Sequence, residues 1–364
     1  MTESRVKKIC FISHGLEGGG MERALISLAN YFAEKNHQIA IINIYRTGVF
    51  FDLNPSIKLI WPQFKRNNKL FYVIRLIPYL RREIVNFKPD SILSFGETFN
   101  AYSVLATRFL KTRVILTNRM WPTLRLRISQ TVANWILYRF ADGVIAQTQA
   151  AKEIIKKKSP NKYITVIPNA VQPINAKTRT SKNRIVSVGR LSEAKGHIIL
   201  IKSFVLLKNN DWTLHLVGDG PQKQNLHEET VKSGLSGKVV FHGHLKDFSN
   251  ILSESDIFVL PSFNEGFPNA LLEAMSVPLA CVSSNCVAGP SDIIEHGRNG
   301  LLFEPGNINE LAGILEQLIN DSNLRKEMAA EAFKVRDTFS FNKIAEKYLY
   351  FILGDQINNE ASSN

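Results

Sequence analysis

The fold of this chain is decided by the stretch DIFVLPSFNEGFPNALLEAM, residues 256–275. An apolar run ending at Leu260 is followed by a loop that contains Gly266, and then by a helical pattern that begins near Pro268. Proline suits the first turn of a helix, because the N–H that it lacks has no helical partner there. The stretch therefore predicts a strand, a loop and a helix, the repeating unit of parallel sheets.

Short apolar runs alternate with helical segments along the whole 364 residues, in two series separated by the polar interval 172–183. The expected strands are residues 8–13, 38–44, 57–61, 91–95, 113–117, 143–146 and 163–167, then 184–188, 212–217, 238–241, 256–260, 279–282 and 301–303. The expected helices of the first series are residues 21–34, 70–86, 100–110, 124–140 and 150–157. Such alternation indicates parallel sheets that are covered by helices on both faces.

We therefore expect an α/β protein with two Rossmann-like, doubly wound domains that face each other across a cleft. The first domain would span residues 1–172 and the second residues 173–339. A last helix, at about residues 340–354, would pack back on the first domain. Ligands of such folds bind beyond the carboxyl ends of the strands.

Charge is distributed unevenly between the two halves. The chain carries a net charge of +13, but residues 1–172 hold 26 basic and 10 acidic side chains (net +16), whereas the rest hold 19 and 22 (net −3). We expect the basic half to meet an anionic partner such as nucleic acid, an acidic membrane surface or a phosphorylated substrate.

The three cysteines suggest a reducing compartment. Cys10, Cys281 and Cys286 form no CxxC motif and no disulfide framework. The apolar run at residues 9–12 is too short for a secretory signal, and no stretch approaches the roughly 20 apolar residues that cross a bilayer. We expect a cytoplasmic protein whose membrane contact, if any, is peripheral.

Two carboxylates frame the helix of the opening stretch. Glu265 precedes the helix and Glu273 lies within it, and the backbone amides of Asn269, Ala270 and Leu271 would form its positive end, which favours a phosphate. Carboxylates accept paired hydrogen bonds from vicinal hydroxyls, so Glu265 could hold a hexose and Glu273 a ribose on either side of a diphosphate. The alternative is two solvated carboxylates on the helix surface, and the pattern alone leaves both open.

This segment resembles the signature of the retaining GT-B glycosyltransferases of family 4, and the similarity extends over nearly the whole chain. The resemblance implies that Glu265 contacts the transferred sugar and Glu273 the ribose of a nucleotide sugar. It also implies that no metal or other cofactor takes part. The sequence contains no Asp-x-Asp motif and no metal-binding spacing of His or Cys. Basic side chains would therefore have to neutralise the negative charge of the leaving group.

Those basic side chains lie in the segment SVGRLSEAKG, residues 187–196. Arg190 and Lys195 can neutralise a diphosphate and stabilise a departing nucleoside diphosphate. Two surface cations near a helix start would instead be unfavourable with the helix dipole. The segment resembles the diphosphate clamp of the family.

A glycine loop, GLEGGGMER at residues 15–23, follows the first expected strand. It does not match the GxGxxG dinucleotide fingerprint, which argues against a dehydrogenase. Consecutive glycines let backbone amides approach a ligand closely. The loop resembles that of the family, whose glycines face the donor phosphates. His14, just before it, either lines the cleft or forms a structural hydrogen bond.

Further strand ends complete the expected site. Asn118 and Arg119 follow one strand, where related enzymes often carry an acid before the basic residue, and Gly96 and Glu97 follow another. The Gly289-Pro290 variant is familiar among relatives that build cell-surface polysaccharides. The resemblance implies the catalytic residues Glu265, Arg190, Lys195 and Arg119. It implies the donor-binding residues Gly18, Gly19, Gly20, Arg190, Lys195, Gly243, His244, Leu245, Glu265, Phe267, Asn269, Ala270, Leu271 and Glu273. The acceptor-binding candidates are His14, Gly96, Glu97 and Asn118.

The basic half combines cations with aromatic residues. The candidate cations are Lys65, Arg66, Lys69, Arg75, Arg81, Arg82, Arg108, Lys111, Arg113, Arg125, Arg127 and Arg139. Basic, aromatic helices suit docking at an anionic leaflet, whereas solvated helix faces are the alternative. The sequence shows no RRM, KH, zinc or helix-turn-helix motif, which argues against nucleic-acid binding.

Together these features predict transfer of a hexose or N-acetylhexosamine from a nucleotide diphosphate sugar, UDP-linked by expectation, to a lipid-linked saccharide of surface glycan assembly. The reaction would retain anomeric configuration, and the enzyme would lie at the inner face of the membrane. A non-catalytic sugar-nucleotide-binding protein and a nucleotide-sugar 2-epimerase of similar architecture are the alternatives.

Overall fold

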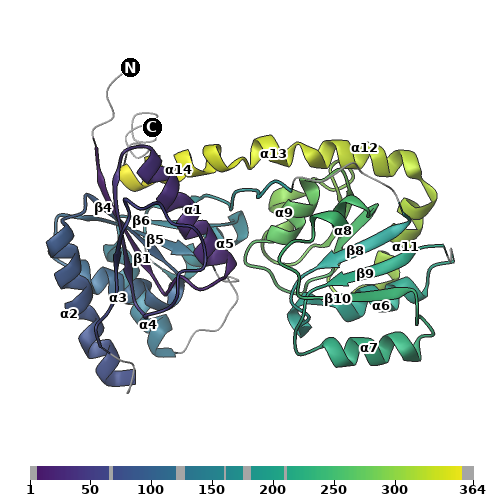
Figure 1. The fold of residues 1–364 in the computed structure, drawn as a ribbon, viewed down its shortest axis with the longest axis horizontal. Coiled ribbons are helices and arrows are strands. Elements are labelled where there is room, and N and C mark those ends of the chain that lie inside the picture. The colour runs from purple at the N-terminus through teal and green to yellow at the C-terminus, as the bar shows by residue number, and fades with distance from the viewer. Residues whose placement is uncertain are drawn as a thin grey trace. The chain divides into compact units, whose positions relative to one another are not determined.

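The computed structural model describes residues 6–64, 69–119, 128–159, 161–174, 182–208 and 211–354. The chain forms two compact units, one made of Met1–Asn169 with Asn342–Asn364 and the other of Ala170–Phe341. We expected the division at residue 172, and it falls at Asn169. In each unit a parallel sheet is covered by helices on both faces (Figure 1).

The sheet of the first unit has seven parallel strands in the order β3-β2-β1-β4-β5-β6-β7. Their bounds are β1 (Lys8–Ser13), β2 (Gln38–Asn43), β3 (Lys58–Ile60), β4 (Ser91–Phe95), β5 (Arg113–Asn118), β6 (Gly143–Ala146) and β7 (Ile164–Val166). The strand order changes direction between β1 and β4, which is the switch point at which doubly wound sheets bind ligands. The predicted α/β, doubly wound architecture is confirmed for this unit.

The helices of the first unit are α1 (Gly20–Glu34), α2 (Lys69–Phe87), α3 (Glu97–Thr107), α4 (Ile128–Leu137), the 3-10 turn η1 (Tyr138–Phe140), α5 (Gln149–Lys158) and α14 (Phe341–Leu353). We expected α3 at residues 100–110, but it begins three positions earlier. Gly96 adopts a φ of +112°, which turns the chain into the helix directly after β4. The expected helix 124–140 is α4 and η1, and its first residues lie outside the described ranges.

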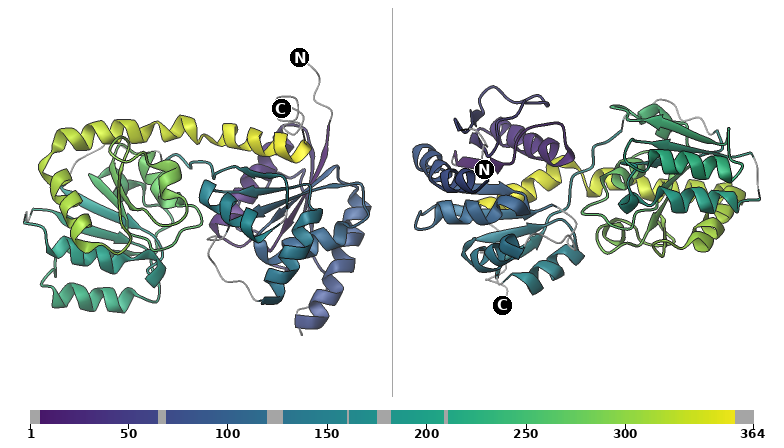
Figure 2. Two further views of the ribbon diagram at one scale, coloured as in Figure 1. Left: turned by 180° about the vertical axis from the view of Figure 1, so that it is seen from behind. Right: turned by 90° about the horizontal axis from the view of Figure 1, so that it is seen from below.

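The last helix completes the first unit. The Ser91 hydroxyl donates to the carbonyl of Ile352 (3.0 Å), and the Tyr31 hydroxyl donates to Glu346 Oε1 (2.7 Å). A Cβ at Gly143 would lie 2.7 Å from the ring of Phe351, so the glycine makes room for that aromatic side chain. Helix α14 thus packs on elements formed by the first half of the chain (Figure 2).

The second unit repeats the same strand order, β10-β9-β8-β11-β12-β13, with all neighbours parallel. Its strands are β8 (Arg184–Val188), β9 (Thr213–Val217), β10 (Val239–Gly243), β11 (Ile257–Leu260), β12 (Ala280–Ser284) and β13 (Leu301–Phe303). Its helices are η2 (Glu193–Lys195), α6 (His197–Val205), α7 (Lys223–Lys232), α8 (Ser249–Ser253), α9 (Asn269–Met275), α10 (Pro290–Ile293), α11 (Ile308–Asn320), α12 (Ser322–Phe333) and α13 (Val335–Thr338). The prediction of a second doubly wound unit is confirmed.

Two apolar clusters cover the faces of this second sheet. Alternate strand residues point to opposite faces, so Ile185 packs with Leu200 of α6 and Leu315 of α11, while Val186 packs with Leu271 of α9 on the other side. Burying both faces fixes the register of the strands, because a slip of one residue would exchange the two faces. The loops at the carboxyl ends of the strands are therefore held on a rigid base.

Candidate active site

The two motif-bearing loops of the second unit follow adjacent strands. β8 pairs with β11 through Ile185 and Val186, although about 70 residues separate the strands in the chain. The strand order changes direction between them, so the loops 189–196 and 261–268 lie at the switch point of the sheet. In doubly wound folds this is the position of the ligand crevice.

Backbone contacts join these loops closely. The Phe263 N–H donates to the carbonyl of Ala194 (2.8 Å). Gly196 adopts a φ of +64°, and a Cβ at this position would lie 2.1 Å from the Pro261 carbonyl oxygen. Only glycine satisfies both the conformation and the close approach. The last glycine of the segment 187–196 therefore holds one loop against the other.

The joined loops bring two predicted catalytic residues into contact. Lys195 Nζ lies 2.6 Å from Glu265 Oε1, which also accepts a 2.6 Å hydrogen bond from the Ser262 hydroxyl. Glu265 is 6% exposed, and the Lys195 side chain is 28% exposed. The Ser284 hydroxyl donates to the carbonyl of Ser262 and so supports the loop from β12. Sequence reasoning gave no role to the two serines, because isolated hydroxyls carry no recognisable pattern.

Arg190, the other predicted cation, is exposed directly after β8. The backbone beside it is fixed by Gly218, since a Cβ there would lie 1.9 Å from the Gly189 carbonyl oxygen. The Gly218 N–H donates to the Gly243 carbonyl (2.8 Å). The carboxyl end of β9 thus contacts the ends of both its neighbours, β8 and β10. His244, directly after β10, is exposed.

The start of α9 differs from the expectation in two ways. Pro268 is the N-cap rather than the first helical residue, and the Asn269 N–H donates to the Phe267 carbonyl (3.0 Å). The expectation that the Asn269 amide is open to a phosphate is therefore wrong, because a tight turn uses it. The amides of Ala270 and Leu271 remain in the first turn, where helix geometry supplies no acceptor.

Other predicted donor-binding residues around α9 serve the packing. The Phe267 side chain is 6% exposed and lies in an apolar cluster, whereas Glu273 is half-buried on the helix. Leu245 packs at the edge of the same cluster. A Cβ at Gly289 would lie 2.4 Å from Pro268 Cδ, so the Gly289-Pro290 variant permits close contact between its loop and the start of α9.

In the first unit, the glycine loop lies between β1 and α1. The carboxylate of Glu22 occupies the space beside Gly19, where a Cβ would lie 2.2 Å from Glu22 Oε2. Gly18 is exposed, and its Cα faces the ring of Phe50. His14, at the end of β1, is exposed and packs edge-on against Tyr45, with 4.9 Å between ring centroids.

Arg119 and its neighbours form the second cluster of predicted residues in the first unit. An Arg119 guanidinium N–H donates to Asn169 Oδ1 (2.6 Å), and the guanidinium lies over the ring of Phe95 at 4.6 Å. Asn118 Oδ1 accepts a hydrogen bond from the Tyr138 hydroxyl (3.1 Å). Glu97 is 7% exposed, and Gly96 is the N-cap of α3. Asn169 was not predicted, although it follows an expected strand.

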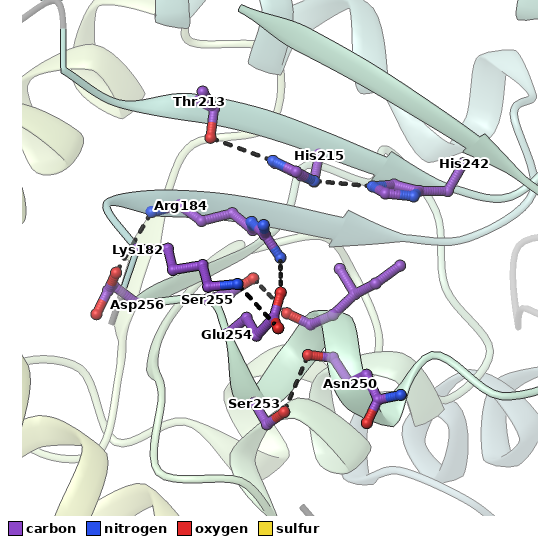
Figure 3. Close-up of polar contacts among 11 residues, drawn as sticks. Lys182, Arg184, Thr213, His215, His242, Asn250, Ser253, Glu254, Ser255 and Asp256 are labelled. Carbon is purple, nitrogen blue, oxygen red and sulfur yellow. Dashed lines mark hydrogen bonds and ion pairs between the residues drawn. The ribbon is translucent and has the colours of Figure 1, made fainter. Parts of the chain in front are cut away.

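A second polar cluster lies elsewhere on the sheet of the second unit, at the beginning of β8 and across β9 and β10 (Figure 3). Arg184 and Lys182 both contact the Glu254 carboxylate, at 2.9 and 3.0 Å. His215 Nδ1 lies 2.8 Å from His242 Nε2. Burial, followed by the neighbouring Arg184, lowers the pKa of both histidines, to about 4 for His215. The Glu254 contacts lie at the beginning of β8, whereas the histidine pair connects β9 with the end of β10.

The described residues show neither a metal centre nor a membrane span. No group of three or more His, Cys, Asp or Glu side chains in these ranges is placed to hold a metal ion. None of the helices described is both long and apolar enough to cross a bilayer. Cys10, Cys281 and Cys286 are buried free thiols.

Two family models match the chain over consecutive segments. The model for Glycosyltransferase Family 4 matches residues 18–173, and the model for glycosyl transferases group 1 matches residues 171–335. The chain is a glycosyltransferase with a family 4 domain and a group 1 domain. The predicted family and enzyme class are confirmed, and both motif-bearing loops of this glycosyltransferase's second unit fall within the group 1 match.

Curated relatives and solved structures agree with this assignment. A Campylobacter jejuni N-acetylgalactosaminyltransferase, named for an acceptor glycan on PP-undecaprenol, is 28% identical and covers 95% of this chain and 98% of its own. The Salmonella typhimurium lipopolysaccharide 1,6-galactosyltransferase is 27% identical and covers 86% of this chain and 90% of its own. The structure of Anabaena HepE in complex with UDP superposes with a TM-score of 0.77 at 21% identity. The match covers 98% of this chain and 100% of HepE. Such neighbours confirm the predicted GT-B fold of this glycosyltransferase.

Proposed function

We propose that this glycosyltransferase moves a hexose or N-acetylhexosamine from a UDP-sugar to a lipid-linked saccharide, with retention of anomeric configuration, in the assembly of a bacterial-type surface glycan. Relatives support the acceptor class, since one is named for a glycan on PP-undecaprenol and another for lipopolysaccharide. UDP complexes of a structural neighbour support the donor class.

The observation that carries the proposal is the contact among Lys195, Glu265 and Ser262 at the switch point. A buried carboxylate that is paired with a cation can exchange partners when a diphosphate arrives. The donor's phosphates would attract Lys195, with Arg190 beside it, while Glu265 would accept hydrogen bonds from the sugar hydroxyls. The same cations would then stabilise the charge that develops on the departing diphosphate.

Retention follows from a front-face route in this proposal. The leaving phosphate oxygen would take the proton from the acceptor hydroxyl as that hydroxyl attacks the same face of the sugar. Glu265 would position the sugar rather than form a covalent bond to it. Arg119 of the first unit, over Phe95 and bonded to Asn169, would contact donor or acceptor from its own strand end.

Thermal shift with a panel of nucleotide sugars tests the donor, because a ligand that binds only the folded state raises its stability by mass action. Mass spectrometry of the product with a lipid-linked oligosaccharide then tests transfer, and NMR of the new glycosidic bond tests retention. Lys195→Ala should weaken nucleotide binding, whereas Lys223→Ala, which breaks an exposed 2.8 Å ion pair with Asp219, should not. Donor hydrolysis without transfer to any saccharide, or an inverted product, would contradict the proposal.

Docking at an anionic membrane is the second part of the proposal. An aromatic–basic surface of the first unit consists of Leu105, Arg108, Phe109, Ile128, Trp135, Arg139 and Phe140. Phe109 is 90% exposed, and the Arg108 guanidinium lies 4.0 Å over the Phe140 ring. Exposed aromatic and apolar side chains beside arginines suit the interface of an anionic leaflet.

Two predicted cations are structural and contribute little to such a surface. Arg81 donates to the carbonyls of Ala106 and Arg108 (3.0 and 2.9 Å) at the end of α3, and Arg113 donates to the Phe351 carbonyl (3.4 Å). The predicted cations Lys65, Arg66, Arg125 and Arg127, like the side chain of Lys69, lie outside the described residues.

Flotation with phosphatidylglycerol vesicles tests the docking. The Trp135→Ser/Arg139→Ser variant should float less than wild type, while Val231→Ser, which removes an exposed valine of the second unit, should float equally. Equal flotation of wild type and both variants would contradict membrane docking. So would binding of the protein to nuclease-treated RNA fragments without binding to vesicles.

A further inference from the structure

A cavity of about 420 Å³ lies in the second unit, behind the loop that carries Lys195. It is lined by Ser192, Glu193, Gly196, His197, Ile198, Gln222, Asn225, Leu226 and Phe263. These residues come from η2, from the beginnings of α6 and α7, and from the loop after β11. The volume is within the range of small-molecule sites. Of the lining residues, Gly196 and Phe263 also take part in the backbone contacts that join the two loops of the candidate active site, and the others do not.

His197 lies beside this cavity, and both of its ring nitrogens are buried. It is 2% exposed, and neither ring nitrogen has a hydrogen-bond partner among the residues described. Buried polar groups are nearly always paired, so this unpaired imidazole is unusual. Burial, with Lys195 adding to it, lowers the pKa of His197 to about 4, so the ring is neutral near pH 7.

An amide pair supplies further hydrogen-bonding groups. The Asn225 side-chain N–H donates to Gln222 Oε1 (2.9 Å). This bond orients both amides and leaves the Gln222 NH₂ and the Asn225 carbonyl oxygen for a ligand. Glu193 and Ser192 line the same cavity. Such a set can both donate to and accept from neighbouring hydroxyls.

Phe263 provides an apolar wall that is held in place. Its ring lies 3.5 Å from the position of a Cβ at Gly196 and 3.2 Å from one at Gly306. The two glycines therefore leave the room that the ring occupies. Ile198 and Leu226 extend the apolar lining. A flat ring beside oriented amides and a carboxylate suits a molecule with one apolar face and a rim of hydroxyls.

The charges of the lining side chains disfavour a phosphate group. The lining contains one carboxylate and neither lysine nor arginine, and the histidine is neutral. An anion would be repelled by Glu193 without any compensating cation. The chemistry fits an uncharged, polyhydroxylated ring instead.

We propose that this cavity is a saccharide subsite that holds one sugar ring of the glycan on which the enzyme acts, separate from the sugar of the donor. The inference rests on the proposed function for the identity of the glycan. Ser192, Glu193 and Gly196 flank Lys195 in the chain, and Phe263 precedes Glu265 by two residues. A sugar in the subsite therefore contacts the same two loops that carry the catalytic pair, and it favours their joined conformation.

Saturation-transfer NMR with galactose, glucose and N-acetylgalactosamine tests the subsite, in the presence of saturating UDP so that the donor site is filled. At least one sugar should receive saturation from the wild-type protein. The Gln222→Ala/Asn225→Ala variant should weaken its apparent affinity about tenfold or more, because two hydrogen bonds are lost. The matched control is Gln224→Ala/Glu228→Ala, which removes a 2.8 Å contact on the exposed side of the same helix and should bind like wild type.

A second readout uses protein labelled with ¹⁵N-histidine. The signal of His197, assigned with His197→Gln, should shift when the sugar binds, with UDP already present. Absence of saturation transfer for all three sugars, unchanged affinity in the Gln222→Ala/Asn225→Ala variant, or displacement of the sugar by UDP would overturn the subsite. Calorimetry with UDP and GDP on the same samples separates the two proposals. If neither nucleotide binds wild type, the proposed function fails, and the assignment of a glycan to the cavity fails with it.

Discussion

Lys195 Nζ lies 2.6 Å from Glu265 Oε1, and this contact connects the loops after two strands that are neighbours in the sheet but far apart in the chain. Each residue neutralises the other where the carboxylate is almost fully buried. Burying a carboxylate without a partner is costly, so the ion pair maintains the site until a ligand exchanges the contacts.

Replacing Glu265 should separate catalysis from folding. We expect Glu265→Ala to lower kcat at least about a hundredfold, the scale of losing one preorganised electrostatic contact. Glu265→Gln should retain the bond to Ser262 and fold normally, yet lose most activity because a neutral amide accepts hydrogen bonds from the sugar hydroxyls more weakly than a carboxylate does. Initial rates and thermal melts measure both effects. Glu295→Gln, which breaks an exposed 2.9 Å ion pair with Arg298, is the control, and wild-type turnover in Glu265→Ala would refute the assignment.

Gly196→Ala should destabilise the second unit. The substitution forces a left-handed φ of +64° on alanine and places its Cβ against the Pro261 carbonyl, so we expect a loss of about 2 kcal/mol or more in the free energy of unfolding. Gly234→Ala is a matched control, since its φ is +69° with no atom within 4 Å of the added Cβ, and should cost only about 1 kcal/mol. Urea denaturation compares the two, and equal losses would show that the loop contact is unimportant.

Acid should destabilise the second unit through its buried histidines. His215 has a pKa of about 4 in the folded protein against 6.5 for the ordinary side chain. Between these values the unfolded chain binds a proton that the folded protein does not. The free energy of unfolding therefore falls as the pH drops from 6.5 towards 4, by up to about 1.4 kcal/mol per pH unit for each such histidine. His197 adds a contribution of the same sign.

The test is denaturant unfolding at several pH values between 7.5 and 5. His215→Phe keeps a ring at this position but removes the titrating group, so its stability should depend less steeply on pH than that of wild type. The comparison uses the slope, because the variant also loses the contacts to Thr213 and His242. An unchanged slope would contradict the pKa assignment.

Transfer should continue in excess EDTA. The sequence lacks an Asp-x-Asp motif, and Arg190 and Lys195 provide the positive charge that a divalent ion would otherwise supply to the leaving diphosphate. Rates measured with EDTA, with added Mg²⁺ and with added Mn²⁺ should agree within error. Strict dependence on either ion would mean that the two cations do not suffice.

The strands could be predicted well from the sequence because apolar, β-rich runs are strong local signals. Element ends were less predictable. The start of α3 depends on the positive φ of Gly96. The hydrogen bond from the Asn269 N–H depends on a turn at Phe267. The pattern of apolar residues predicts neither of these backbone conformations.

The candidate site was predicted residue by residue, but its internal contacts were not. Lys195 meets Glu265 only because β8 lies next to β11, an order that packing of the whole sheet decides. Ser262, Ser284 and Asn169 support their neighbours through single hydrogen bonds. The orphaned nitrogens of His197 are visible only once the surrounding helices are in place.

The docking of α14 on β4 and β6 has a consequence for biosynthesis. Most of the first unit precedes the second unit in the chain, yet the carbonyl of Ile352 and the ring of Phe351 pack on its sheet. The ribosome makes α14 only after the whole second unit, so the sheet of the first unit lacks its contacts with α14 while the second unit is being synthesised. Chaperone protection during that interval would be greatest for the amino-terminal half.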